Sequence, residues 1–288
     1  AIGQAMAIQG HLGKASALLG QAIPLFEKAA NWPEWIQAMS FRGSAIAGMG
    51  DYKQGISELN RALSRANEIN SLTGISVSNN CLGFAHFFGG DLNQAIEAAQ
   101  AAVMAAEKSG DRIYVYVGYG LWGWAAGRAG QLEAAAACLA RSQEVAQELG
   151  GQIIMADVFT TAQAEIAFYM KRFDEALRLA KQAVNIAEKM GGIWGEGIGR
   201  RVWGQALIAL SSPNWEQAEM QIAASLRVLE SGQNLIEMAR TRVAWGAVCH
   251  GRKDFTSARK NWEQAAAQFQ ASGTTRELEQ VSTLLADF

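Results

Sequence analysis

The stretch that decides the fold is LGFAHFFGGDLNQAIEAAQAAVMAAEK, residues 82–108. A Gly-Asp turn begins seven residues after Gly83, and the small residue Ala95 lies twelve residues after Gly83. A large residue precedes a small one by three positions seven times, at Leu12/Ala15, Tyr52/Gly55, Leu92/Ala95, Leu132/Ala135, Phe173/Ala176, Trp215/Ala218 and Phe255/Ala258. The small residues are separated by 40, 40, 40, 41, 42 and 40 positions. A period that regular is the signature of a repeat array.

The pattern inside each repeat predicts two antiparallel helices. Small residues at the point where two helices cross let the backbones approach to roughly 8–10 Å. A turn glycine ends the first helix in the left-handed conformation without strain. A single hairpin cannot bury its apolar face, so neighbouring hairpins must stack. We therefore expect an all-α solenoid of about seven helical hairpins.

The spacing of Gly83, Ala95 and Ala102 resembles the tetratricopeptide repeat in its longer, about forty-residue variety, over essentially the whole chain. This resemblance implies a right-handed α-α superhelix whose first helices line the inner wall. In repeat style, residues 105–135 are similar to the C-terminal arrays of bacterial multidomain signalling ATPases and fused nucleotide cyclases. That likeness implies an array that senses a partner or an inducer, with the ATPase, cyclase or DNA-binding part elsewhere in the intact protein.

The period predicts one tetratricopeptide-like solenoid domain over residues 1–288. The expected repeats span approximately 1–31, 32–71, 72–111, 112–151, 152–192, 193–233 and 234–273, and an amphipathic capping helix follows at 275–287. The first-helix glycine of the first repeat falls at Gly3, so this repeat lacks its opening residues. We expect the chain to be a C-terminal fragment of a longer protein.

Two segments depart from the pattern. LSSPNWEQAE (210–219) has a turn that is two residues longer, with Pro213 and Trp215 in the places of Gly and Tyr. GGIWGEGIG (191–199) places five glycines in nine residues, which should weaken the start of that helix. It is either a loose junction or a hinge.

Composition excludes several functions. The net charge is −2, from 25 basic and 27 acidic residues, and no basic stripe is interleaved with aromatics, so we expect no direct contact with nucleic acid. No apolar run approaches the ~20 residues that span a bilayer, and we expect a cytoplasmic protein. Cys81, Cys138 and Cys249 have no metal-ligand spacing and are expected to be free thiols. With no catalytic motif, the sequence predicts no enzyme, no catalytic residue, no metal and no cofactor.

The first helices have an unusual load of aromatic residues. The positions expected to face the inner groove are Asn80, Phe84, Phe87, Phe88, Trp124, Arg128, Glu165, Phe168, Tyr169, Arg201 and Gln205. Aromatic residues and arginine are typical of binding hot spots. Trp122, Trp203 and Trp245, one residue before the repeat glycine, are expected in the core. Alternatively, the groove aromatics thicken the packing between repeats and leave no open groove.

These features predict a non-enzymatic protein–protein interaction scaffold or regulatory module. Its groove would bind a protein or peptide partner, or another domain of the same full-length chain. The alternative is a small-molecule (inducer) sensor domain of a multidomain bacterial signalling protein, in which the aromatic residues stack on the ligand. A sensor should contain a closed pocket of roughly 300–1,000 Å³, whereas a scaffold should present a long open channel.

Overall fold

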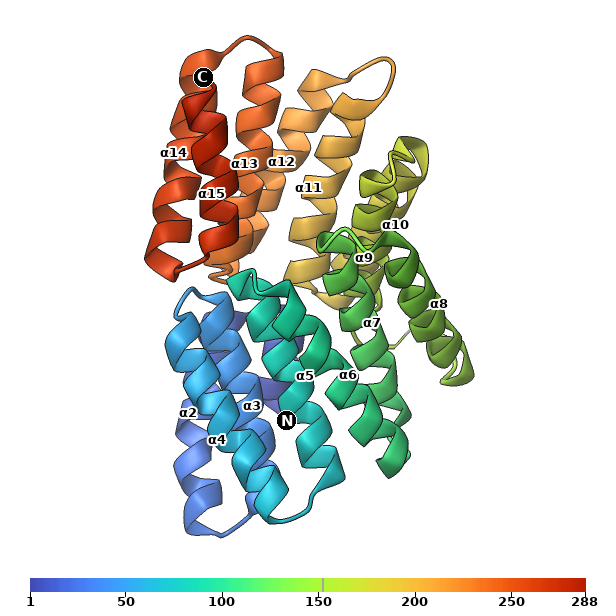
Figure 1. Cartoon of the computed structure of the whole chain (residues 1–288), viewed down its shortest axis with the longest axis vertical. Coiled ribbons are helices and arrows are strands. Elements are labelled where there is room, and N and C mark those ends of the chain that lie inside the picture. Colours follow the sequence, from blue (N-terminus) through green and yellow to red (C-terminus); the bar gives the residue numbers. More distant parts are fainter. Residues whose placement is uncertain (152) are drawn as a thin grey trace. The chain divides into compact units, whose positions relative to one another are not determined.

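The computed structural model describes residues 1–151 and 153–288, which form helices joined by short turns (Figure 1). The chain divides into two compact units, Ala1–Met155 and Ala156–Phe288. The expected start of the fifth repeat, residue 152, lies outside the described residues. The prediction of an all-α, tetratricopeptide-like array is confirmed.

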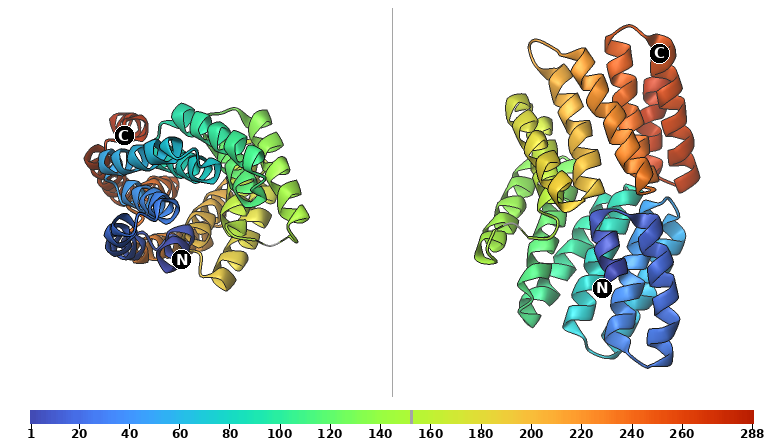
Figure 2. Two further views of the ribbon diagram at one scale, coloured as in Figure 1. Left: turned by 90° about the horizontal axis from the view of Figure 1, so that it is seen from below. Right: turned by 180° about the vertical axis from the view of Figure 1, so that it is seen from behind.

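Consecutive helices pack on one another as hairpins within each unit, which Figure 2 shows from two further directions. The first unit contains α1 (Ile2–Gln9), α2 (Leu12–Lys28), α3 (Trp32–Gly48), α4 (Tyr52–Glu68), α5 (Leu72–Gly89), α6 (Leu92–Ser109), α7 (Arg112–Arg128) and α8 (Leu132–Glu148). The second contains α9 (Ala156–Tyr169), α10 (Phe173–Met190), α11 (Ile193–Ala209), α12 (Trp215–Ser231), α13 (Leu235–Gly251), α14 (Phe255–Ser272) and α15 (Thr275–Ala286).

The turn residues explain where the helices begin and end. The Asp91 carboxylate accepts a hydrogen bond from the backbone N–H of Gln94 at 3.2 Å, and so caps the start of α6. Gly90, directly before it, has φ 81° and ends α5 in the left-handed conformation. Asp51 caps α4 in the same way, through the N–H of Gln54 at 3.1 Å. These are the Gly-Asp turns on which the repeat prediction was based.

The small residues lie where the two helices of a hairpin cross. A Cβ added at Gly43 of α3 would lie 2.9 Å from the carbonyl oxygen of Gly55 on α4. A Cβ at Gly123 of α7 would lie equally close, 2.9 Å, to the carbonyl oxygen of Ala135 on α8. Backbones this close leave no room for a side chain, which confirms the predicted register of the glycine and the small residue.

The glycine-rich segment 191–199 is helical from Ile193 onward, and its glycines receive side chains from neighbouring helices. The carboxylate of Asp157, on α9, occupies the space where Gly195 would have a Cβ. Gly197 receives Leu229 of α12, which would lie 2.6 Å from an added Cβ. Burial raises the pKa of Asp157, against the effect of backbone hydrogen bonds that include one with Gly195. Close packing therefore accounts for glycines whose sequence suggested a loose junction or a hinge.

The last helix, α15, packs on α14. Its residue Val281 is buried in one cluster with Trp262 and Phe269. Partly buried Leu278 and Phe288 pack against the same cluster. The helix thus covers the apolar face of the last hairpin.

Candidate functional site in the first helices

Spacing along α5 and α7 places predicted groove residues on common faces. Asn80, Phe84 and Phe87 follow one another at intervals of four and three residues along α5. Trp124 and Arg128 are four residues apart on α7. Residues three or four apart share one side of a helix. Since α5 and α7 are neighbouring first helices that contact each other, these two faces can meet.

The faces meet in an aromatic group that we call the α5–α7 cluster, formed by Phe84, Phe87, Phe88, Trp124 and Arg128. The ring centroids of Phe87 and Trp124 are 4.6 Å apart. The guanidinium of Arg128 lies 4.2 Å from the centroid of the Phe87 ring and 5.1 Å from that of Trp124. Both distances are within the range of cation–π attraction. The four aromatic side chains are buried, and Arg128 is partly exposed.

Asn80 is the unusual polar residue of this face. It is only 3% exposed, and neither its Nδ2 nor its Oδ1 has a hydrogen-bond partner among the described residues. Its neighbour Asn79, by contrast, donates from Nδ2 to the carbonyl oxygen of Ile75 at 2.9 Å. Buried polar groups are nearly always hydrogen-bonded, so an unpartnered amide needs an explanation. An amide offers two N–H donors and one carbonyl acceptor to a ligand.

The first helices of the second unit carry buried charges instead. Arg201 on α11 lies 3.4 Å from Oε1 of Glu165 on α9 and 2.6 Å from Oε2 of Glu237 on α13. Glu237 also pairs with Arg240 at 2.6 Å, and Arg240 pairs with Glu277 on α15. These five residues, Glu165, Arg201, Glu237, Arg240 and Glu277, are called the ion-pair ladder below. The ladder joins the first helices α9, α11 and α13 and the last helix, α15.

The remaining predicted residues have different surroundings. The Phe168 ring lies 6.2 Å from that of Tyr169 and 5.5 Å from that of Phe173 at the start of α10. Tyr169 is 41% exposed, whereas Phe168 and Gln205 are partly buried. Within the first unit, the predicted aromatic residues and Arg128 thus form the α5–α7 cluster, and within the second unit Glu165 and Arg201 belong to the ladder. Their role in binding stays a prediction.

Sequence reasoning missed three ladder residues, Glu237, Arg240 and Glu277. A signal for them was present, because Glu165, Arg201 and Glu237 are separated by 36 and 36 residues and Arg240 and Glu277 by 37. A spacing of 36–37 residues is about one helical turn shorter than the forty-residue repeat, so these opposite charges lie on neighbouring helices of the array, one turn away from equivalent positions.

The cysteines match the prediction of free thiols, since Cys81, Cys138 and Cys249 are all unbridged and buried. Burial raises the pKa of Cys81 to about 12 and that of Cys138 to about 11. A thiol with a raised pKa stays protonated at neutral pH and is a poor nucleophile. Among the residues that the structure describes, no group of three His, Cys, Asp or Glu side chains could hold a metal ion.

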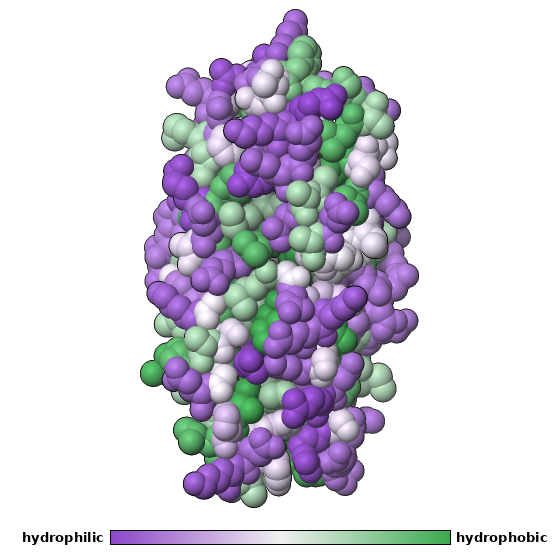
Figure 3. Space-filling view, turned by 90° about the vertical axis from the view of Figure 1, so that its left-hand side faces the viewer, coloured by the Kyte–Doolittle hydropathy of each residue, from purple (hydrophilic) through white to green (hydrophobic). Residues whose placement is uncertain are grey.

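Figure 3 shows how hydrophobic and hydrophilic residues are distributed over one face of the exterior. The face drawn in Figure 3 is largely hydrophilic, with hydrophobic side chains in small groups between polar ones. None of the described helices combines the length and the apolar character needed to cross a bilayer.

The fold defines the chain as a tetratricopeptide-like helical repeat array. Neither a family model nor a curated protein sequence matches the chain. Solved structures do resemble it. The apo form of RapI has a TM-score of 0.64 at 11% identity, covering 92% of this chain and 93% of its own. A Rap protein complexed with competence and sporulation factor has a TM-score of 0.59 at 12% identity, over 91% of this chain and 80% of its own.

A third similar structure is a signal transduction ATPase with numerous domains from Pyrococcus horikoshii, which has a tetratricopeptide repeat sensor. Its TM-score is 0.52 at 14% identity, over 95% of this chain but only 42% of that protein. At these identities the three likenesses establish the fold. Function must therefore be argued from the residues of this chain.

Proposed function

We propose that the chain is a non-enzymatic protein–protein interaction module that binds a protein or peptide segment along its first helices. The segment belongs to a separate partner or to another part of the full-length protein. The α5–α7 cluster supplies an apolar floor of Phe84, Phe87 and Trp124, and Arg128 supplies a charged edge. Aromatic residues with arginine form the centre of many protein interfaces.

The unpartnered amide of Asn80 is the observation that supports this proposal. Its N–H and carbonyl groups match the carbonyl and N–H groups of a peptide backbone. A bound peptide would satisfy both, and would turn an unfavourable buried group into two hydrogen bonds. Because Asn80 is buried in the unbound chain, the peptide enters through a shift between neighbouring hairpins. Repeat arrays permit such shifts, because each hairpin contacts only its neighbours.

The test begins with selection of binders from a library of random twelve-residue peptides displayed on phage. Selected peptides are then titrated against the natural chain and against Asn80→Leu. Leucine has nearly the same shape as asparagine but no polar atoms. We expect binding to weaken at least tenfold, about 1.4 kcal/mol, while thermal stability stays equal or rises, since an unsatisfied buried group has been removed.

Asn79→Leu is the matched control, because it removes the neighbouring amide, whose hydrogen bond to Ile75 is already made. This variant should lose some stability and keep its peptide affinity. If Asn80→Leu lowers stability and leaves affinity unchanged, Asn80 is structural and the proposal fails. A selection that returns no binder at all would favour the inducer-sensor alternative.

A further inference from the structure

In three hairpins, the large residue that opens the second helix packs against a glycine near the end of the next first helix, at Gly48, Gly89 and Gly251. A Cβ added at Gly89, at the end of α5, would lie 2.6 Å from the ring of Tyr52, which opens α4. Gly251, at the end of α13, receives the ring of Trp215, which opens α12, in the same way. These pairs are separated by 37 and 36 residues. Because glycine has no side chain, an aromatic ring can lie directly on the helix backbone at these positions, which are called glycine seats below.

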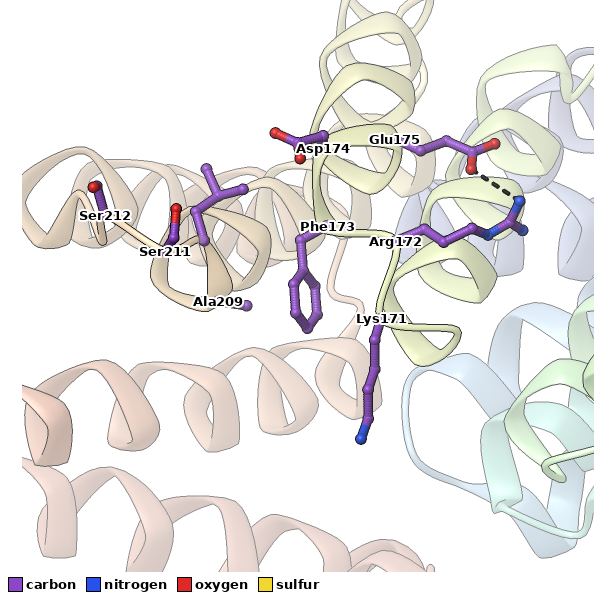
Figure 4. A pocket seen from close by; sticks show the side chains of 9 residues that line it. Lys171, Arg172, Phe173, Asp174, Glu175, Ala209, Ser211 and Ser212 are labelled. Atoms are coloured by element: carbon purple, nitrogen blue, oxygen red, sulfur yellow. Dashed lines mark ion pairs between the residues drawn. The ribbon is translucent and has the colours of Figure 1, made fainter.

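Phe173, which opens α10, has no such seat. The residue 36 positions later is Ala209, the last residue of α11. The Phe173 ring packs instead near Phe168 of its own hairpin, at 5.5 Å between centroids. Directly after Ala209 the chain is extended, with φ −67° and ψ 158° at Leu210, and the longer turn noted in the sequence follows. A hollow of about 580 Å³ remains between residues 171–175 and 209–212 (Figure 4).

Two basic and two acidic side chains surround this hollow, and one pair of them is closed by an ion pair. The Arg172 guanidinium pairs with the Glu175 carboxylate at 3.0 Å, drawn as a dashed line in Figure 4. Asp174 and Lys171 have no ion pair with any residue that the structure describes. In Figure 4 the Asp174 carboxylate points across the hollow toward the 209–212 turn, and Lys171 extends away from it beyond the Phe173 ring.

The end of α11 adds a further negative contribution. Its last carbonyl groups carry the negative end of the helix dipole. In the turn after α11, only one described backbone N–H donates a hydrogen bond to a carbonyl group of α11. It is the N–H of Asn214, which lies 3.2 Å from the carbonyl oxygen of Leu207. The Asp174 carboxylate, the negative end of α11 and the Phe173 ring favour a cation. The positive end of α10, which begins at Phe173, acts in the opposite direction.

We propose that this hollow is a second interaction surface, which binds the cationic side chain of an arginine or lysine from a partner protein. The alkyl part of that side chain lies on Phe173 and Ala209, and its charged end reaches Asp174 and the end of α11. The surface is built from the turns of the second unit and uses none of the side chains assigned to peptide binding above. Its test is therefore independent of the test of peptide binding.

Two short peptides probe the charge requirement directly, acetyl-Gly-Arg-Gly-amide and acetyl-Gly-citrulline-Gly-amide. Citrulline has nearly the shape of arginine but no charge. Each peptide is titrated into the isotopically labelled chain, and backbone amide signals are followed by two-dimensional NMR. We expect the arginine peptide to shift signals of residues 171–175 and 209–212 and to bind about fivefold more tightly, as an exposed ion pair allows. Equal binding of the two peptides, or shifts confined to other residues, would overturn the proposal.

Three variants complete the test. Asp174→Asn should weaken the arginine peptide about fivefold, whereas its matched control Lys171→Gln should bind at least as tightly as the natural chain. Ala209→Gly restores the missing seat, so that Phe173 can move onto α11, fill the hollow and abolish binding. If Lys171→Gln weakens binding and Asp174→Asn does not, the hollow prefers anions and the proposal is wrong. Unchanged binding by Ala209→Gly would equally refute the proposed pocket.

Discussion

Replacing Arg201 with methionine should strongly destabilise the second unit. The Arg201 side chain is only 4% exposed, and it bridges Glu165 and the 1% exposed Glu237. Methionine keeps much of the aliphatic volume but removes the charge that compensates two buried carboxylates. Taking one partner from a buried ion pair costs about 3–5 kcal/mol. Since Arg240 still holds Glu237 at 2.6 Å, we expect a loss near the lower limit, about 3 kcal/mol.

Arg200→Met is a matched control on the adjacent residue. Arg200 pairs with Glu188 at 2.7 Å and Glu196 at 2.8 Å, but the Glu188 side chain is half exposed. Ion pairs in contact with water contribute about 0–1 kcal/mol each. Arg200→Met should therefore cost far less than Arg201→Met. Arg201→Lys should be intermediate, because one ammonium group cannot imitate the two-armed guanidinium that joins two carboxylates.

The assay must detect local opening, because repeat arrays need not unfold in one step. Hydrogen exchange read by mass spectrometry reports each helix separately. A loss of about 3 kcal/mol raises the opening equilibrium roughly 100-fold, so amides of α9, α11 and α13 should exchange about 100 times faster in Arg201→Met. Urea unfolding followed by circular dichroism gives the global value. Equal effects of Arg201→Met and Arg200→Met would show that the ladder does not stabilise the unit in the way argued.

Three further predictions follow from packing and titration. Gly246→Ala should cost about 1–3 kcal/mol in urea unfolding, because the added methyl overlaps the Trp262 indole; an unchanged midpoint would contradict the tight crossing of α13 and α14. Burial lowers the pKa of His86, whose Nδ1 lies 2.8 Å from the hydroxyl of Tyr52. The unfolded chain then binds the proton more readily, so the free energy of unfolding should fall as pH drops through about 6.5, and His86→Gln should flatten that slope; parallel pH profiles would disprove it. Deleting residues 275–288 should expose the last hairpin and cause aggregation, measured by light scattering, and a fully stable, monodisperse product would exclude a covering role for α15.

The repeat register could be predicted from the sequence because every hairpin obeys the same steric demand. Gly123 and Ala135 meet at a backbone crossing, and so do their equivalents Gly43 and Gly55. A requirement repeated seven times is visible above the noise of individual substitutions. For the same reason the Gly-Asp turns located the ends of α3 and α5 well.

The faces of the first helices could not be assigned with equal success. Trp122, Trp203 and Trp245 were predicted to lie in the core; each is partly buried, and Trp203 and Trp245 pack against buried hydrophobic clusters. Trp124, predicted to face a groove, is almost fully buried against Phe87. A first helix such as α5 contacts its hairpin partner α6, the preceding second helix α4 and the first helices α3 and α7, so several of its faces are apolar. Polarity alone then cannot distinguish the groove face from the core face, because the two faces are offset by only one or two residues along the helix.

The departures from the repeat pattern are the most informative part of the chain for function. In an array, equivalent positions show what ordinary packing requires, so an exception needs its own explanation. Ala209 stands where Gly89 and Gly251 form seats for aromatic rings, and the turn after it is longer. Asn80 has an unsatisfied amide beside Asn79, whose hydrogen bond is made. Neither exception improves packing, and each leaves unused hydrogen-bonding capacity or volume that a partner could fill. The proposed peptide site and the proposed cation site thus share one expectation: Asn80→Leu and Ala209→Gly, which remove the unused amide and fill the unused volume, should keep the fold and remove the binding.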